Sequence, residues 1–119
     1  MLHWPDSMFT YIIEDKILLP NDAFGQHLAS SQRFDDEVDQ TVLMEEAVTY
    51  YANILTPFSP LIVRKIQEVV AMKLPIDIIA PSHGIIWRKD PMKIVTAYMD
   101  WCTGKTVKNK VVIVFDTMW

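Results

Sequence analysis

The sequence has few of the features that identify common classes of protein. Cys102 is the only cysteine among 119 residues, so an internal disulfide is excluded and a reducing, cytoplasmic environment is expected. No apolar run reaches about 18 residues, and the N-terminus lacks the basic and apolar segments of a signal peptide, so no membrane association is expected. The net charge is −4 and no basic patch is visible, which makes nucleic acid a poor candidate partner.

Short catalytic motifs are scarce as well. There is no HExxH motif and no pair of CxxC motifs, so the common zinc-site signatures are absent. What the sequence does have is apolar residues, which make up 50% of the chain. A chain of this length and composition can bury a core, and it forms one domain at most.

The spacing of apolar residues and turn formers predicts seven elements in the order β-β-α-α-β-α-β, which indicates an α/β fold. Two strands form a hairpin over residues 8–20, with a polar turn at 14–16. The segment "TPFSP" is expected to break the helical pattern, with Ser59 as the N-cap of the second helix. Gly104 is expected to stop the third helix. The remaining ranges are helices over 39–55, 60–73 and 90–102 and strands over 76–81 and 110–116.

Residues at three- and four-residue steps predict the buried face of each of the first two helices. In the first helix these residues are Val42, Leu43, Ala47, Tyr50, Tyr51 and Ile54. In the second helix they are Leu61, Ile62, Ile66, Val69 and Val70.

Three polar residues lie beside turn signals at which strands are expected to end. They are His3, Asp22 and His83. Ligands in open α/β sheets gather at strand ends, and two imidazoles with a carboxylate suit Fe, Mn or Zn. The alternative is that all three are surface residues of loops. His27, five residues after Asp22, is a candidate ligand, a hydrogen-bond partner of a ligand, or neither.

Five motifs in order carry a family resemblance: "LHWPDSMFTY", "LLPNDAFGQH", "YYANILTPFSP", "APSHGIIWRKDP" and "VVIVFDTMW". With them the chain resembles part of a flavodiiron protein, a family also called A-type flavoproteins or rubredoxin:oxygen oxidoreductases. The resemblance implies half of a metallo-β-lactamase-like αββα sandwich over residues 1–105. It also implies a linker and the first β-strand of a flavodoxin-like FMN domain over residues 106–119. Both ends are therefore expected to continue in a longer protein.

The resemblance implies a pair of non-haem irons and assigns a role to each polar residue. His3 would bind one iron, Asp22 would bridge the two irons, and His83 would bind the other. The remaining ligands of the family come from an HxExD motif, which this sequence lacks. Three ligands shared by two metals leave each ion under-coordinated. The isolated chain is therefore expected to bind irons weakly or not at all, and to be inactive.

Further candidate residues also follow from the resemblance. The family motif DTMWxST begins the FMN phosphate loop, and here it is represented by Thr117, Met118 and Trp119 without the Ser-Thr part. Tyr51, in "YYAN", and His27 are the candidate catalytic residues beside the irons. The alternative for Tyr50 and Tyr51 alike is that both are core aromatic residues.

The function implied by the resemblance is reduction of O2 to water, of NO to N2O, or both. Electrons would come from a rubredoxin-like donor or a flavin reductase and pass through FMN, with flavin and irons meeting across a head-to-tail homodimer. Two alternatives stay open at this point. One is a zinc-dependent hydrolase of the metallo-β-lactamase superfamily, and the other is a non-catalytic fragment.

Overall fold

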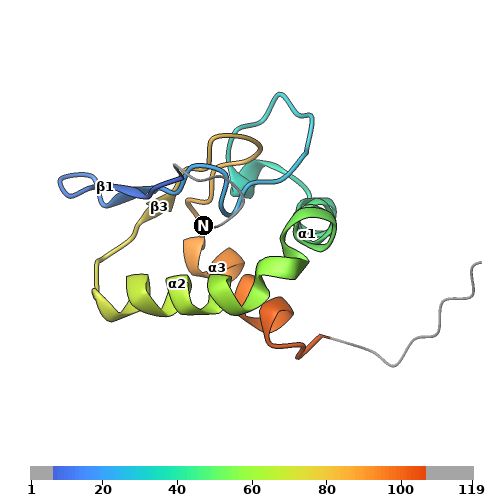
Figure 1. The fold of residues 1–119 in the computed structure, drawn as a ribbon. Helices are drawn as coiled ribbons and strands as arrows, with labels where there is room; N and C mark the ends of the chain where they lie inside the picture. Colours follow the sequence, from blue (N-terminus) through green and yellow to red (C-terminus); the bar gives the residue numbers. More distant parts are fainter. Residues whose placement is uncertain (1–6, 107–119) are drawn as a thin grey trace, which may run out of the picture.

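A computed structural model describes residues 7–106, and its sheet has three short strands. Strands β1 (Thr10–Ile12) and β2 (Ile17–Leu19) pair antiparallel, which confirms the predicted hairpin. Strand β3 (Ile78–Ile79) pairs with β2 in parallel, so β2 lies in the middle of the sheet. The strands lie above α2 in the view of Figure 1, and the hairpin extends away from the helices.

Helix α1 (Gln40–Tyr50) begins where an aspartate supplies its cap. The Oδ1 atom of Asp39 accepts the backbone N–H groups of Thr41 at 2.8 Å and Val42 at 3.0 Å. These bonds satisfy two donors that an α-helix leaves unpaired at its first turn. They also hold the pKa of Asp39 below its ordinary value. The predicted start of this helix is confirmed.

The α-helical pattern is interrupted at "TPFSP", as predicted, but the chain crosses the interruption by helical turns of other types rather than by a loop. After α1 the chain forms one π-helical stretch, η2 (Tyr51–Leu55), and one 3-10 turn, η3 (Thr56–Phe58), before α2 (Ser59–Ala71). Pro57 and Pro60 fall in the first turns of η3 and α2, where a missing N–H group costs little. Ser59 is the first residue of α2 rather than its N-cap, and its hydroxyl donates to the Thr56 carbonyl.

Helix α3 (Pro91–Cys102) follows Asp90, as the sequence predicts. Asp90 occupies the N-cap position, although its side chain makes no capping hydrogen bond. Gly104 has a φ of +73°, the left-handed conformation in which glycine commonly ends a helix. Its backbone N–H donates to the Trp101 carbonyl, so the predicted stop is confirmed.

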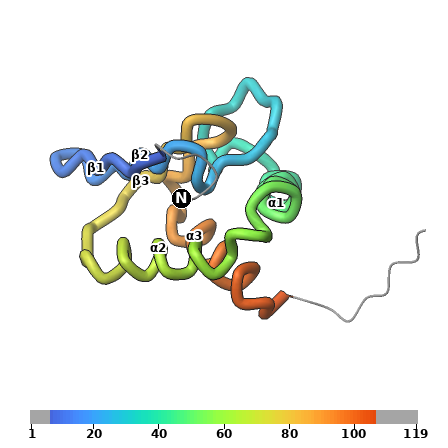
Figure 2. The backbone as a smooth tube through the Cα atoms, viewed as in Figure 1, coloured from blue at the N-terminus to red at the C-terminus, as the bar shows by residue number. Residues whose placement is uncertain are grey.

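The core lies between the sheet and the helices, and the tube in Figure 2 shows α3 between β3 and α2. Its fully buried side chains include Leu43, Ile79, Ile85, Trp87 and Ile94. Two predicted core residues are exposed, Val42 by 44% and Val70 by 55%. Val42 lies on the outward side of α1, one residue before buried Leu43, and Val70 lies near the end of α2.

Some predictions concern residues outside the part of the chain that the structure describes. These are the final strand, His3, Thr117, Met118 and Trp119. Within residues 7–106, no helix is long and apolar enough to cross a lipid bilayer.

Candidate metal centre

The parallel pairing of β2 with β3 brings Asp22 and His83 together. Both strands end at the same edge of the sheet, and the loops that follow them carry these two residues. The backbone N–H of Ser82 donates to the Asn21 carbonyl at 2.8 Å, which joins the two loops directly. As a result the Nε2 atom of His83 lies 3.9 Å from the Oδ1 atom of Asp22, and both side chains are about one-third exposed.

This separation suits a metal ion that is bound by both atoms. First-row metals bind imidazole nitrogen and carboxylate oxygen at about 2.0–2.2 Å, so two donors on one ion lie at most ~4.2 Å apart. The Ser82 hydroxyl donates to Asp22 Oδ1 at 2.7 Å, which orients the carboxylate. A carboxylate has a second oxygen and can therefore bridge two ions. The structure therefore places Asp22 and His83 close enough to share one ion, and their roles as ligands stay a prediction.

The aromatic rings of Tyr50 and His27 lie beside the Asp22–His83 pair. Ring centroids are 5.2 Å apart for Tyr50 and His83, 5.0 Å for His27 and Tyr50, and 5.3 Å for His27 and His83. Burial raises the pKa of Tyr50, and the negative charge of Asp22 raises it further. Tyr50 therefore keeps its proton at neutral pH and presents a hydrogen-bond donor close to the carboxylate. His27 lies beside the pair but is exposed.

Tyr51, the tyrosine selected from the sequence, lies in a different environment. Its hydroxyl is 2.7 Å from Ser59 Oγ and 3.5 Å from Cys102 Sγ. Its ring packs against Tyr98 and Trp101. Successive residues on a helix point about 100° apart, so the structure brings Tyr50, and not Tyr51, to the Asp22–His83 pair. Tyr50 and Tyr51 follow Ala47 by three and four residues, so the sequence spacing does not distinguish the two tyrosines.

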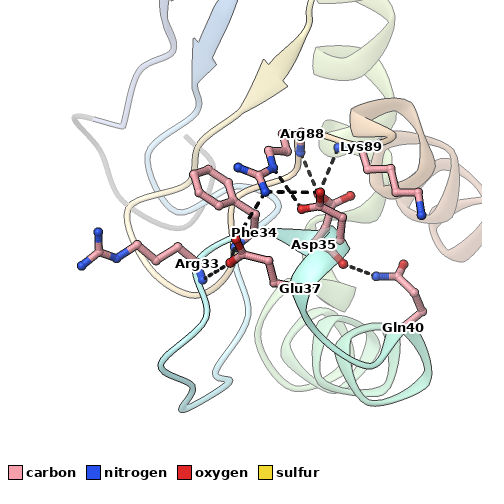
Figure 3. Close-up of polar contacts among 8 residues, drawn as sticks. Arg33, Phe34, Asp35, Glu37, Gln40, Arg88 and Lys89 are labelled. Atoms are coloured by element: carbon pink, nitrogen blue, oxygen red, sulfur yellow. Dashed lines mark hydrogen bonds and ion pairs between the residues drawn. The ribbon is translucent and has the colours of Figure 1, made fainter.

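Sequence reasoning missed two buried polar residues that hold the loops of the site together. Gln26 is 1% exposed and Asp35 is 2% exposed. The Asp35 carboxylate accepts the backbone N–H groups of Arg88 at 2.9 Å and Lys89 at 3.0 Å, as Figure 3 shows. The Asp35 carbonyl accepts from the Gln40 side chain. Each loop is therefore tied to a segment more than 50 residues away.

Arg88 completes this attachment. Its guanidinium pairs with Asp36 at 2.9 Å and with Glu37 at 3.3 Å, and it lies 3.6 Å above the centroid of the Phe34 ring. The hydrogen bond from Arg88 holds the pKa of Asp36 below its ordinary value.

The structure does not bring a third metal ligand to the pair within residues 7–106. No group of three or more His, Cys, Asp or Glu side chains in that range could hold a metal ion. His3, the predicted third ligand, lies outside the described residues. The whole ligand set, Asp22 and His83 included, therefore stays a prediction.

Comparison with known proteins places this geometry in context, although no protein-family model matches the chain. A nitric oxide reductase of Moorella thermoacetica is 62% identical over 119 residues, which are all of this chain and 30% of that protein. An anaerobic nitric oxide reductase flavorubredoxin of Aeromonas hydrophila is 52% identical over 118 residues, which are 99% of this chain and 24% of that protein.

Solved structures show the same similarity in fold. Rubredoxin oxygen:oxidoreductase from Desulfovibrio gigas superposes with a TM-score of 0.82 at 36% identity, over 87% of this chain and 26% of that chain. The flavodiiron protein from Giardia intestinalis gives 0.80 at 46% identity, over 90% of this chain and 26% of that chain. The chain spans less than a third of each of these proteins. In sequence and in fold, it is similar over nearly its whole length to one segment of flavodiiron proteins.

Proposed function

We propose that this chain supplies part of the diiron centre of a flavodiiron oxidoreductase, which reduces O2 to water or NO to N2O. The observation that supports the proposal most directly is the 3.9 Å separation of Asp22 Oδ1 and His83 Nε2 at the end of two parallel strands. The similarity to a nitric oxide reductase and to a rubredoxin oxygen:oxidoreductase supports the reaction class.

In this proposal three residues of the chain hold the metals. Asp22 would be shared by two irons, with His83 as a ligand of one and His3 as a ligand of the other. When bound, such a pair would supply the electrons for reduction of O2 or NO. The ligands missing from this chain come from an HxExD segment elsewhere in the whole protein.

Two neighbouring side chains serve the substrate pocket. Tyr50, whose ring centroid lies 5.2 Å from that of His83, would offer its hydroxyl as a hydrogen-bond donor on the Asp22 side of the pocket. His27, whose ring centroid lies 5.3 Å from that of His83, would line the exposed edge of the same pocket. Tyr51 is assigned a packing role here, because its hydroxyl is engaged with Ser59 and Cys102.

The proposal divides the chain between two domains of the parent protein. Residues 1–105 belong to a metallo-β-lactamase-like domain, and residues 106–119 lead into a flavodoxin-like domain in which Thr117, Met118 and Trp119 contact FMN. A rubredoxin-like donor or a flavin reductase feeds electrons to the flavin, and a head-to-tail homodimer joins flavin to irons. The isolated chain is inactive, because it lacks the HxExD ligands.

The test is to purify the whole protein that contains this segment, and to measure its metals, its visible spectrum and its consumption of NO and O2. The expected result is two irons and one FMN per chain, with turnover of at least one of the two gases. Zinc without flavin would overturn the proposal and favour a hydrolase of the metallo-β-lactamase superfamily. Neither metal nor flavin would favour a non-catalytic role.

One substitution connects this result to the site. Asp22→Asn removes a charge and the bridging ligand, so iron content is expected to fall by at least about tenfold, since even the partners of ligands cost 10–100-fold. Asp77→Asn is the matched control, because Asp77 is an exposed partner of Lys16 at 3.1 Å. It should leave the iron content unchanged.

A further inference from the structure

Gln26 is a buried side chain with an unusually complete set of partners. Its Oε1 atom accepts the Ile85 backbone N–H at 2.6 Å, and its Nε2 atom donates to the Ile85 carbonyl at 3.1 Å. An amide carries one donor group and one acceptor, which match the two backbone groups of a single residue. Glutamate of the same length would keep the acceptor but lose the donor when ionised. The Gln26 side chain therefore fixes the segment two residues after His83.

The backbone of the same residue contacts the imidazole itself. The His83 Nδ1 atom lies 3.3 Å from the Gln26 carbonyl oxygen. A carbonyl oxygen only accepts hydrogen bonds, so this contact requires the proton of a neutral imidazole to be on Nδ1. Nε2 then carries the lone pair, and Nε2 is the atom that faces Asp22 at 3.9 Å.

Two glycines leave room for this arrangement. A Cβ atom at Gly25 would lie 2.6 Å from His83 Cε1, so the imidazole packs against bare backbone there. Gly84 has a φ of +80°, and a Cβ atom there would collide with the Gln26 amide. His83 and Gln26 thus fill the space that side chains at these two positions would need, and the ring has little freedom to rotate.

We propose that Gln26 is a positioning residue for His83. Its side chain holds residues 84–85, and its carbonyl takes the Nδ1 proton, so that Nε2 is free to bind metal beside Asp22. The inference rests on the proposed function for its purpose, but its geometry is a property of the chain without metal. A Gln26 that merely joined two loops would affect stability and leave the imidazole tautomer unchanged.

The tautomer can be read directly by NMR. Long-range 1H–15N correlations of the 15N-labelled 119-residue chain, at a pH about 1.5 units above the ordinary imidazole pKa of ~6.5, report which nitrogen carries the proton. His83 is expected as the Nδ1–H form. His27, which is exposed, provides a comparison in the same spectrum and should not share this preference. A His83 that is predominantly Nε2–H would overturn the proposal.

Substitutions then separate positioning from stability. Gln26→Met keeps the length and the main-chain carbonyl but removes both side-chain bonds to Ile85, so residues 84–85 should lose their position and the His83 ring its alignment with that carbonyl. The Nδ1–H to Nε2–H ratio of His83 should then fall by up to about fivefold, the shift that corresponds to losing one ordinary hydrogen bond. Gln67→Met, at an exposed position of α2, is the matched control and should leave the ratio unchanged. A folded Gln26→Met chain with an unchanged ratio would contradict the proposal.

A second variant covers the case in which Gln26→Met does not fold. Gln26→Glu keeps the acceptor for the Ile85 N–H and should give an intermediate ratio, and an unchanged ratio in that folded variant would also contradict the proposal. The result of the tautomer experiment does not depend on the result of the test of the proposed function. A protein that contains zinc and no flavin would refute the diiron proposal, whereas the tautomer of His83 in the metal-free chain tests Gln26 alone.

Discussion

Two regions of this molecule are specified by different kinds of contact. The polar junction, defined as residues 20–38 together with 80–90, is joined across more than 50 residues of sequence by three hydrogen bonds. Gln26 and Asp35 accept from backbone N–H groups, and Trp87 donates to a backbone carbonyl. The apolar groove is a cavity of about 140 Å³ among the hairpin, α2 and α3. It is lined by Phe9, Leu18, Phe24, Ile66, Val69, Val70, Leu74, Ile76, Met92 and Val95.

The difference shows how the side chains of the candidate site are positioned. Hydrogen bonds in the junction are directional, and a lost partner leaves a buried group unpaired at a cost of ~1–3 kcal/mol. In the groove the free energy follows the apolar area that is removed from water, at about 25 cal/mol per Å². Val70 and Met92 there are 55% and 46% exposed. Substitutions in the junction should therefore cost much more than substitutions at the groove.

The largest effect is expected at Trp87, which is 0% exposed and donates from Nε1 to the Phe24 carbonyl at 2.9 Å. Trp87→Ala should lower the free energy of unfolding by about 3–5 kcal/mol, because it leaves a cavity and an unpaired carbonyl. Urea denaturation followed by circular dichroism measures this loss, and a chain already unfolded without urea would also agree. A loss below about 1 kcal/mol would remove the distinction between the two regions.

The next effect is expected at Asp35. Asp35→Ala removes the acceptor of two backbone N–H groups, those of Arg88 and Lys89, and should cost about 2–3 kcal/mol, the range for hydrogen bonds to a charged group. Asp77→Ala is the control, because its pairing with Lys16 is exposed and worth at most about 1 kcal/mol. Equal losses for the two variants in urea denaturation would contradict the assigned role of Asp35.

The sequence predicts some of this architecture and misses other parts for identifiable reasons. The hairpin and α3 follow from local signals, namely alternating apolar residues, Pro91 and Gly104, and the structure confirms them. The continuous helical path through Pro57 depends on π and 3-10 turns, which apolar spacing does not indicate. Ser59 was consequently misassigned as an N-cap.

The sequence likewise predicts some residues of the candidate site and misses others. The turn signals correctly pointed to two strand ends, and the parallel pairing of β2 with β3 brings Asp22 to His83. Gln26 and Asp35 were missed because a polar residue is expected to be exposed until the fold shows its partners. Tyr50 and Tyr51 are adjacent and identical, so only the direction of each side chain around the helix distinguishes them.

A smaller effect is expected at the buried hydroxyl of Tyr98. This residue is 1% exposed, and its hydroxyl has no hydrogen-bond partner among the described residues. Tyr98→Phe should therefore change the free energy of unfolding at pH 7 by less than about 1 kcal/mol, since no good hydrogen bond is lost. Urea denaturation at neutral pH checks this, and a loss above about 2 kcal/mol would indicate a partner for the hydroxyl.

The same variant has a distinct signature at high pH. Burial is the main cause that raises the pKa of Tyr98, so the folded state favours the protonated phenol. Its contribution is fully present below the unfolded pKa of ~10 and is lost as the pH rises above that value. Stability should fall above pH ~10 in the wild type and less steeply in Tyr98→Phe, because Tyr50 and Tyr51 keep their raised pKa values while the contribution of Tyr98 is removed. Identical slopes would show that Tyr98 does not titrate with unfolding.

The smallest effect is expected at the rim of the groove, where Val70 on α2 is 55% exposed. Val70→Ala removes two methyl groups but changes the buried apolar area only slightly, so the free energy of unfolding should fall by about 0.5 kcal/mol or less. Ile66, one turn earlier on α2 and lining the same groove, is 7% exposed, and Ile66→Val should cost about 0.5–1.5 kcal/mol although it removes only one carbon. If urea denaturation gave the reverse order, the exposure of Val70 in this fold would be incorrect. Val70 would then be a buried residue, and the groove would be closed to solvent like the polar junction.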